Sequence, residues 1–164
     1  MNMESKKAAL RLFQYGLFIY TSKSTSSEEL QPYAASTVTW VSQASFEPPL
    51  VMVALRRDSW SHETTKQSGI FALNILGADQ KAMAGKFFKE VSLEGNKLNG
   101  FEFQEGSDGA PIFSDAIAAL ECRVTDRVER GDHTVVVGNI CEARVTKPDA
   151  VPLSLSETGW KYGG

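Results

Sequence analysis

Apolar and polar residues alternate along the second half of this chain with the two-residue period of a β-strand. Leu120, Cys122 and Val124 are separated by charged or polar residues, a pattern typical of a strand with one buried face. After a turn predicted at residues 130–132, the returning strand carries apolar residues in both phases up to Val145. This indicates that both faces of the strand are covered. A second subunit could provide one of the two covers.

Four segments of the first half are also predicted to be strands, because they are apolar or alternate in polarity. They lie at residues 17–20, 33–45, 50–55 and 70–76. The polar, Ser-rich residues 21–32 predict a solvated connection between strands. Residues 90–109 are rich in Gly, Asn and charge and predict an irregular surface excursion, held down by Phe101 and Phe103.

Helical periodicity and capping residues predict helices over residues 6–15, 59–68 and 79–88. Gly16 and Gly69 are expected to end the first two, and Asp79 is expected to cap the third. A few short helices among about seven short strands, without a βαβ rhythm, predict a mainly β fold with attached helices. The most suitable architecture is an antiparallel barrel. Neither a GxGxxG nor a GxxxxGK[ST] motif is found, which disfavours a Rossmann or P-loop domain.

Composition narrows the function classes. The chain has 164 residues, 42% of them hydrophobic, which predicts one globular domain spanning residues 1–164. Its 17 Lys and Arg residues stand against 20 Asp and Glu residues, without a basic stripe, so nucleic acid is not an expected partner. No apolar run reaches the roughly 18 residues that a membrane-spanning helix needs, and a cytoplasmic location is expected.

The cysteines and histidines show no metal-binding spacing. Cys122 and Cys141 form no CxxC pair and are expected to be small buried residues of strands. His62 and His133 are far apart in sequence, so no metal site is predicted.

A first candidate site is the segment around Trp40. Hydroxyl groups at Thr37, Thr39, Ser42 and Ser45 surround this indole. Hydroxyls and free backbone N–H groups at a strand end can bind a flat heterocycle with several acceptors, and Trp40 can offer stacking surface. This composition suits a flavin. The alternative is an edge strand with solvated hydroxyls and a core Trp.

A second candidate site follows two arginines at the start of the predicted helix 59–68. Arg57, Ser59 and Ser61 suit a phosphate, because unpaired N–H groups and the helix dipole favour an anion there. The alternative is an ordinary N-cap formed by Asp58 or Ser59. His62 by itself is a weak signal for chemistry.

Three separated strings in this order resemble the flavin reductase-like family. Residues 39–45 followed by Pro48-Pro49-Leu50 resemble the WVSQxSxxPPL signature of that family. Residues 68–76 are similar to its SGxFxxNxL junction, and residues 131–138 to its GDHxxxxG turn. The resemblance covers about residues 8–146.

The resemblance implies an FMN-binding split barrel, an antiparallel barrel that forms a homodimer with the flavin in a cleft near the subunit interface. It implies that residues 37–45 hold the isoalloxazine and ribityl groups, with Thr37, Thr39, Trp40, Val41, Ser42 and Ser45 as the candidates. The implied phosphate-binding residues are Arg57, Ser59, Ser61 and His62, while Trp60 packs on the flavin or on the adenine of a dinucleotide.

The function implied is an NAD(P)H-dependent flavin oxidoreductase that passes hydride from nicotinamide C4 to flavin N5. His133 is expected on the nicotinamide side of the flavin, or else as a turn residue bonded to local backbone. An FMN electron carrier similar to flavoredoxin, and a flavin storage or sensing module, remain alternatives. The choices between FMN and FAD and between NADH and NADPH stay open. The sequence also leaves open which oxygenase or redox protein would accept the reduced flavin, and what role the short C-terminal tail has.

Overall fold

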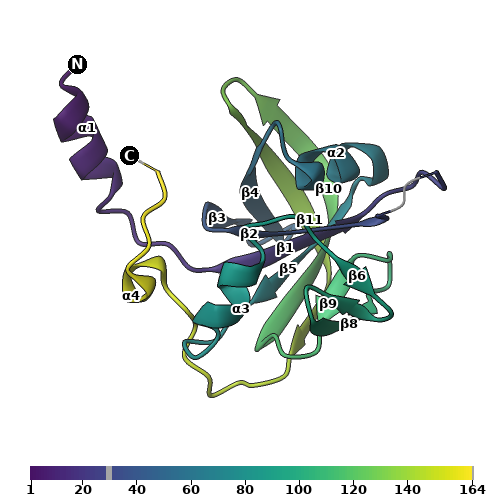
Figure 1. Cartoon of the computed structure of the whole chain (residues 1–164). Helices are drawn as coiled ribbons and strands as arrows, with labels where there is room; N and C mark the ends of the chain where they lie inside the picture. Colours follow the sequence, from purple (N-terminus) through teal and green to yellow (C-terminus); the bar gives the residue numbers. More distant parts are fainter. Residues whose placement is uncertain (29–30, 164) are drawn as a thin grey trace.

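A seven-stranded antiparallel sheet forms the centre of the computed structural model, which describes residues 1–28 and 31–163 (Figure 1). The strand order is β2-β1-β5-β10-β11-β4-β3. The bounds are β1 Phe18–Lys23, β2 Tyr33–Val38, β3 Val41–Ser45, β4 Leu50–Arg56, β5 Ile70–Ile75, β10 Ala118–Glu129 and β11 His133–Val145. The predicted mainly antiparallel β fold is confirmed.

The two outer strands of this sheet, β2 and β3, follow each other in the chain. Only Thr39 and Trp40 separate them, so the sheet must curl until its two edges come together at this corner. β2 and β3 are not hydrogen-bonded neighbours in the sheet, and the corner therefore stays open. The single strand predicted over residues 33–45 is thus two strands with a break in the middle.

The strand β1 runs further than predicted. Thr21 and Ser22 were expected in a solvated loop but are fully buried within β1. Their hydroxyls are satisfied, since Thr21 Oγ1 donates to the Pro111 carbonyl at 2.6 Å and Ser22 Oγ donates to the Ile70 carbonyl at 2.8 Å. Composition alone cannot distinguish buried, hydrogen-bonded hydroxyls from the solvated hydroxyls of a loop.

A second, four-stranded sheet occupies much of the segment predicted to be irregular. Its order is β6-β7-β8-β9, with bounds β6 Leu93–Glu94, β7 Lys97–Leu98, β8 Phe101–Glu105 and β9 Pro111–Phe113. The prediction of an irregular excursion was wrong because strands of two to five residues show no readable alternation. Phe103 is buried and Phe101 packs on the same core, so these two rings do hold the segment down.

Asn74 ties the two sheets together. Its side-chain amide donates to the Ile19 carbonyl at 3.2 Å and the Pro111 carbonyl at 3.3 Å. Its carbonyl oxygen accepts from the Phe113 backbone N–H at 2.8 Å. The Asn of the predicted SGxFxxNxL junction therefore serves the fold.

Four short helices are attached to the sheets in the part of the chain that the structure describes. They are α1 Met3–Leu10, α2 Trp60–Ser68, α3 Lys81–Lys86 and α4 Leu155–Thr158. As predicted, α2 ends at Gly69, which adopts a left-handed φ of 69°. The N-cap of α3 is Gln80, so the cap predicted at Asp79 was wrong.

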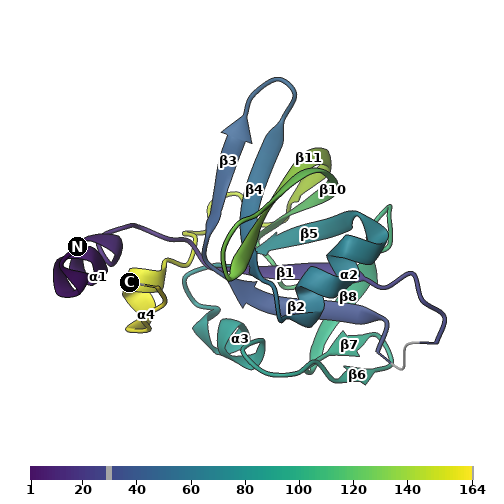
Figure 2. The ribbon, with the colours of Figure 1, turned by 90° about the horizontal axis from the view of Figure 1, so that it is seen from above.

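The N-terminal helix differs most from its prediction over residues 6–15. α1 ends at Leu10 and buries none of its residues, while Leu12 and Phe13 beyond it are 77% and 60% exposed. Figures 1 and 2 show α1 standing away from the sheet, on the same side as α4 and the C-terminus. The predicted amphipathic helix is therefore shorter than expected, and within it only Leu10 of the apolar stripe is half-buried.

The two cysteines lie in different environments. Cys122 is buried as predicted, whereas Cys141 is exposed, so the prediction for Cys141 was wrong. Cys141 lies where the pairing of β10 and β11 shifts register between Glu121 and Cys122, and the outer half of β11 is exposed. Among the described residues, no helix is both long and apolar enough to cross a membrane.

Candidate functional site

A cavity of about 410 Å³ opens at the corner where the two edges of the main sheet meet. Its walls come from the end of β2 and the link to β3, the end of β4, and the C-terminal segment. The residues that line it include Ser36, Thr37, Val38, Thr39, Trp40, Ala54, Arg56, Ser59, Phe88, Leu155, Trp160, Lys161 and Tyr162. We call this space the corner cavity.

Thr37 fixes one wall of the corner cavity. Its Oγ1 donates to the Ala84 carbonyl at 2.6 Å, and its backbone N–H donates to the Phe87 carbonyl at 3.2 Å. These bonds join β2 to α3 and place Phe88 at the rim. The hydroxyl of Thr37 is therefore already occupied in holding the wall.

Thr39 and Trp40 carry buried polar atoms that have no partner in the described part of the chain. These atoms are Thr39 Oγ1 and Trp40 Nε1, which belong to residues that line the corner cavity. Trp60 Nε1 is a third buried polar atom of this kind. A buried polar group without a hydrogen bond costs about 1–3 kcal/mol. These atoms are closed off from the cavity as the side chains stand, so the side chains would have to turn to reach a ligand there. A flavin ring has donors and acceptors along its edge that could then pair with them.

A second cavity of about 460 Å³ adjoins the first, since both are lined by Ser36, Ser59 and Phe88. We call it the serine cavity, because Ser61 also lines it together with Trp60 and Lys89. Ser61 Oγ lies 2.8 Å from Ser36 Oγ, so one of these hydroxyls donates to the other, and the accepting hydroxyl keeps its own hydrogen for another partner.

Ser59 has a second task as the N-cap of α2. Its Oγ accepts from the His62 backbone N–H at 3.1 Å and donates to the Arg56 carbonyl at 2.7 Å. The alternative interpretation of this segment, an ordinary N-cap by Ser59, is thus realised. Ser59 also lines both the corner cavity and the serine cavity.

A third cavity of about 950 Å³ shares Trp40, Arg56 and Tyr162 with the corner cavity. We call it the basic groove, because Lys6 and Arg57 also line it.

His133 lies in the basic groove at the end of the β10–β11 hairpin. Its ring centre is 4.6 Å from that of Trp40, and its Nδ1 lies 2.8 Å from Asp132 Oδ1. The hydrogen bond and charge of His133 hold the pKa of the Asp132 carboxyl below its usual range. His133 is therefore oriented by one carboxylate, beside Trp40, which lines both the basic groove and the corner cavity.

The structure does not gather every predicted site residue. Val41, Ser42 and Ser45 lie on β3, which projects with β4 from the sheet, and they line none of the three cavities (Figure 2). His62 also lies outside them, because its Nε2 faces Thr134 Oγ1 at 2.9 Å. Arg57 lines the basic groove, away from Ser61.

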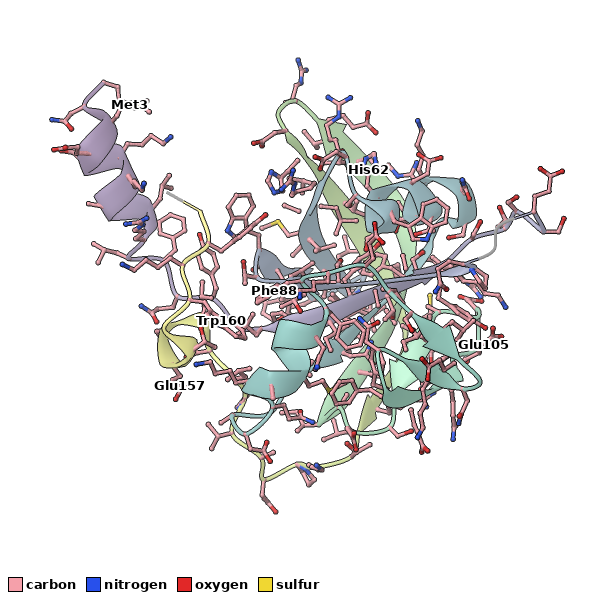
Figure 3. All side chains as sticks on the ribbon, in the orientation of Figure 1. Met3, His62, Phe88, Glu105, Glu157 and Trp160 are labelled. Carbon is pink, nitrogen blue, oxygen red and sulfur yellow. The ribbon has the colours of Figure 1, made fainter. Side chains whose placement is uncertain are left out.

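The wall formed by the C-terminal segment was missed by the sequence reasoning. Trp160 packs edge-on against Phe88, with ring centres 4.9 Å apart. Both residues are labelled in Figure 3. The ring of Tyr162 lies 5.2 Å from that of Trp40, and burial raises the pKa of this phenol. The available signal was two aromatic residues between Gly159 and Gly163, both of which adopt positive φ.

Rings and hydroxyls line the corner cavity and the serine cavity, and among the described residues neither lining contains a cysteine or a histidine. The arrangement suits stacking and edge recognition of a planar cofactor rather than covalent catalysis.

The chain matches the family described as flavin reductase like domain over residues 10–161. It is 31% identical over 132 residues to a probable flavin reductase of Rhizobium meliloti, covering 80% of this chain and 40% of that protein. It is 33% identical over 137 residues to diflavin flavoprotein A 1 of Synechocystis, covering 83% of this chain and 23% of that protein. The chain thus spans less than half the length of these two relatives.

Among solved structures, the chain resembles the styrene monooxygenase flavin reductase of Pseudomonas putida S12. The TM-score is 0.74 at 27% identity, covering 92% of this chain and 91% of that one.

Proposed function

We propose that this chain, which belongs to the flavin reductase-like family, reduces a flavin with NAD(P)H as the electron donor. The observation that carries the proposal is the corner cavity, which Thr39 and Trp40 line and which adjoins the serine cavity. Among the described residues, Thr39 Oγ1 and Trp40 Nε1 have no hydrogen-bond partner. The corner cavity's volume of about 410 Å³ lies within the range of roughly 300–1,000 Å³ that is usual for cofactor pockets.

In this proposal the flavin ring lies in the corner cavity and the ribityl phosphate extends toward Ser59 and Ser61. A bound flavin supplies N5 as the atom that accepts hydride from nicotinamide C4. Trp40 gives the ring an apolar surface, and Thr39 binds its edge. Phe88 and Trp160 keep water from the opposite side, which favours hydride transfer over side reactions.

The protein then holds and shields the two reactants, and this proximity is the main source of rate. His133 and Tyr162 stand where the corner cavity meets the basic groove, so the nicotinamide would approach along that groove. Reduced flavin would pass to an oxygenase or another redox protein. The resemblance to a monooxygenase flavin reductase supports that choice of partner.

A second candidate function is electron transfer by tightly held FMN to a partner protein. The match to part of a diflavin flavoprotein favours it, because there the matching segment is one piece of a larger flavoprotein. The visible spectrum of the purified protein separates the two functions. A yellow protein that retains its flavin through purification and shows negligible NAD(P)H oxidation supports the carrier. A nearly colourless protein that turns over only with added FMN or FAD supports the reductase.

The flavin position is tested by Thr39→Val, which removes the unpartnered hydroxyl and keeps the shape. Loss of one hydrogen bond of about 1 kcal/mol should weaken flavin binding roughly fivefold, measured by fluorescence titration. Ser42→Ala is the matched control, since Ser42 is exposed and lines none of these cavities. Equal flavin affinities of Thr39→Val and the unmodified chain would show that the flavin ring does not bind in this cavity.

A further inference from the structure

The basic groove carries more positive charge than its own carboxylates neutralise. Arg56 is paired with Asp58, with Nη2 2.6 Å from Oδ2. Asp132 Oδ1 is hydrogen-bonded to His133 Nδ1 at 2.8 Å, and three basic residues, Lys6, Arg56 and Arg57, line the groove against the two carboxylates. Both acidic residues that line the groove are therefore engaged.

Lys6 and Arg57 are the two remaining basic residues of this groove. Neither takes part in an ion pair within the described residues 1–28 and 31–163. The contact of Arg57 is to backbone, from Nη1 to the Gly131 carbonyl at 3.5 Å. A long bond to a carbonyl leaves the guanidinium able to bind an anion.

The N-terminal helix directs Lys6 toward the groove. Lys6 and Leu10 are the half-buried residues of α1, one helical turn apart, and both line the groove. Backbone bonds hold the segment after the helix, with Leu155 N–H donating to the Tyr15 carbonyl at 2.8 Å and Leu17 N–H donating to the Leu153 carbonyl at 3.0 Å. The inner face of α1 is thus the outer wall of the groove.

We infer that Arg57 and Lys6 bind phosphate groups of the pyridine nucleotide while its nicotinamide reaches Trp40, an inference that rests on the proposed function. The groove joins the corner cavity at Trp40 and Tyr162, where the nicotinamide must meet the flavin. Its volume of about 950 Å³ suits an extended ligand. A guanidinium binds phosphate oxygens in pairs, and a lysine binds them as a point charge. Arg57 therefore serves the nucleotide and not the flavin phosphate.

Two groups could be recognised, the pyrophosphate common to NADH and NADPH or the 2′-phosphate of NADPH. Calorimetric titration of the protein with NADP⁺, NAD⁺ and adenosine 2′,5′-bisphosphate separates them, with FMN present and absent. The variants are Arg57→Ala and Lys6→Ala. Lys7→Ala and Lys66→Ala are matched controls, because both lysines are exposed and line none of the three cavities.

Each groove variant is expected to weaken NADP⁺ binding about tenfold, with the controls unchanged. A loss confined to NADP⁺ and the bisphosphate supports recognition of the 2′-phosphate, and an equal loss for NAD⁺ supports recognition of the pyrophosphate. Added salt should weaken binding to the unmodified chain more than to Arg57→Ala. Unchanged binding of all three nucleotides to both groove variants would overturn the inference.

The binding data also separate this inference from the proposed function. A chain that binds NADP⁺ through Arg57 but never oxidises NAD(P)H with added flavin supports the groove and contradicts the reductase. Normal flavin reduction by both groove variants, with unchanged KM for NADH and NADPH, supports the reductase and contradicts the groove.

Discussion

The phenol oxygen of Tyr162 lies 3.0 Å from Nε2 of His133 and so ties the C-terminal segment to the hairpin that ends in β11. With Nδ1 donating to the Asp132 carboxylate at 2.8 Å, a neutral His133 leaves Nε2 to accept the phenol hydrogen. The bond occupies the nitrogen that would otherwise face an arriving nicotinamide. In the proposed function, the Tyr162 phenol and the nicotinamide carboxamide would compete for Nε2 of His133.

Substitutions at these two positions should have opposite effects on NAD(P)H. In the proposed function His133 would hydrogen-bond the nicotinamide carboxamide, so His133→Ala should raise the KM for NAD(P)H or slow flavin reduction roughly fivefold. Tyr162→Phe keeps the ring but frees His133, so it should lower the KM by a similar factor. Rapid-mixing measurements of flavin reduction provide both values.

The double variant supplies the control, because it should behave as His133→Ala alone when Tyr162 acts through His133. Flavin affinity should change little in all three proteins. Unaltered flavin reduction by His133→Ala at every NAD(P)H concentration would leave His133 as a structural turn residue and favour the electron carrier.

Local signals explain which elements could be predicted from the sequence. The helix α2 was found because Ser59 and Gly69 mark its two ends. The β10–β11 hairpin was found because β10 alternates in polarity and β11 is a long strand with apolar residues in both phases. The strands β6 and β7 contain two residues each, and their pairing depends on contacts that no short window shows. Tertiary contacts likewise decide the burial of Thr21.

The candidate site was predictable only on the side that is built from consecutive residues. Thr37, Thr39 and Trp40 adjoin in sequence and also in the corner cavity. The opposite wall comes from Trp160 and Tyr162, more than a hundred residues away, where neither period nor motif indicates a site. The order of residues along the chain does not show that the C-terminal segment folds back onto the link between β2 and β3.

Gly138 faces the ring of Phe71, and this contact explains the last glycine of the GDHxxxxG segment. A Cβ at Gly138 would lie 2.5 Å from Phe71 Cε1, inside the core cluster that contains Cys122 and Val136. Gly138→Ala should therefore lower the free energy of unfolding by about 1–3 kcal/mol, measured by urea denaturation. Gly131→Ala is the control, because a Cβ there meets nothing within 4 Å.

A second change tests the cause of that loss. Phe71→Leu combined with Gly138→Ala should recover part of the stability relative to the sum of the single effects, because the smaller side chain makes room. Additive losses would mean that the glycine is required for another reason.

The two cysteines should differ in reactivity. Burial raises the pKa of the Cys122 thiol to about 12, so at neutral pH it is protonated and shielded, whereas Cys141 is exposed. A thiol reagent should label one cysteine per native chain, and both after denaturation. Cys141→Ser should abolish the native labelling and Cys122→Ser should leave it unchanged. Native labelling that survives Cys141→Ser would show that the barrel opens at Cys122.

The outer face of β4 and β11 presents apolar side chains to solvent. Met52 is 41% exposed and lies opposite Val137 in the sheet, and Val135 follows on the same face. Phe46, at the tip of the hairpin that projects in Figure 2, is 87% exposed. Such a surface on a protruding hairpin is typical of a contact with another protein chain.

We expect a homodimer formed through this face, with a mass by light scattering of about twice the 18.0 kDa of one chain. Met52→Glu should dissociate it, because a carboxylate placed opposite Val137 would be desolvated in the contact without a partner. Lys66→Glu changes a charge on exposed α2 and should leave the mass unchanged. If the flavin lies near the subunit interface, as the resemblance implies, Met52→Glu should also weaken flavin binding. A Met52→Glu monomer that keeps full flavin affinity would show that one subunit builds the whole flavin site, and a dimer that persists would place the contact elsewhere.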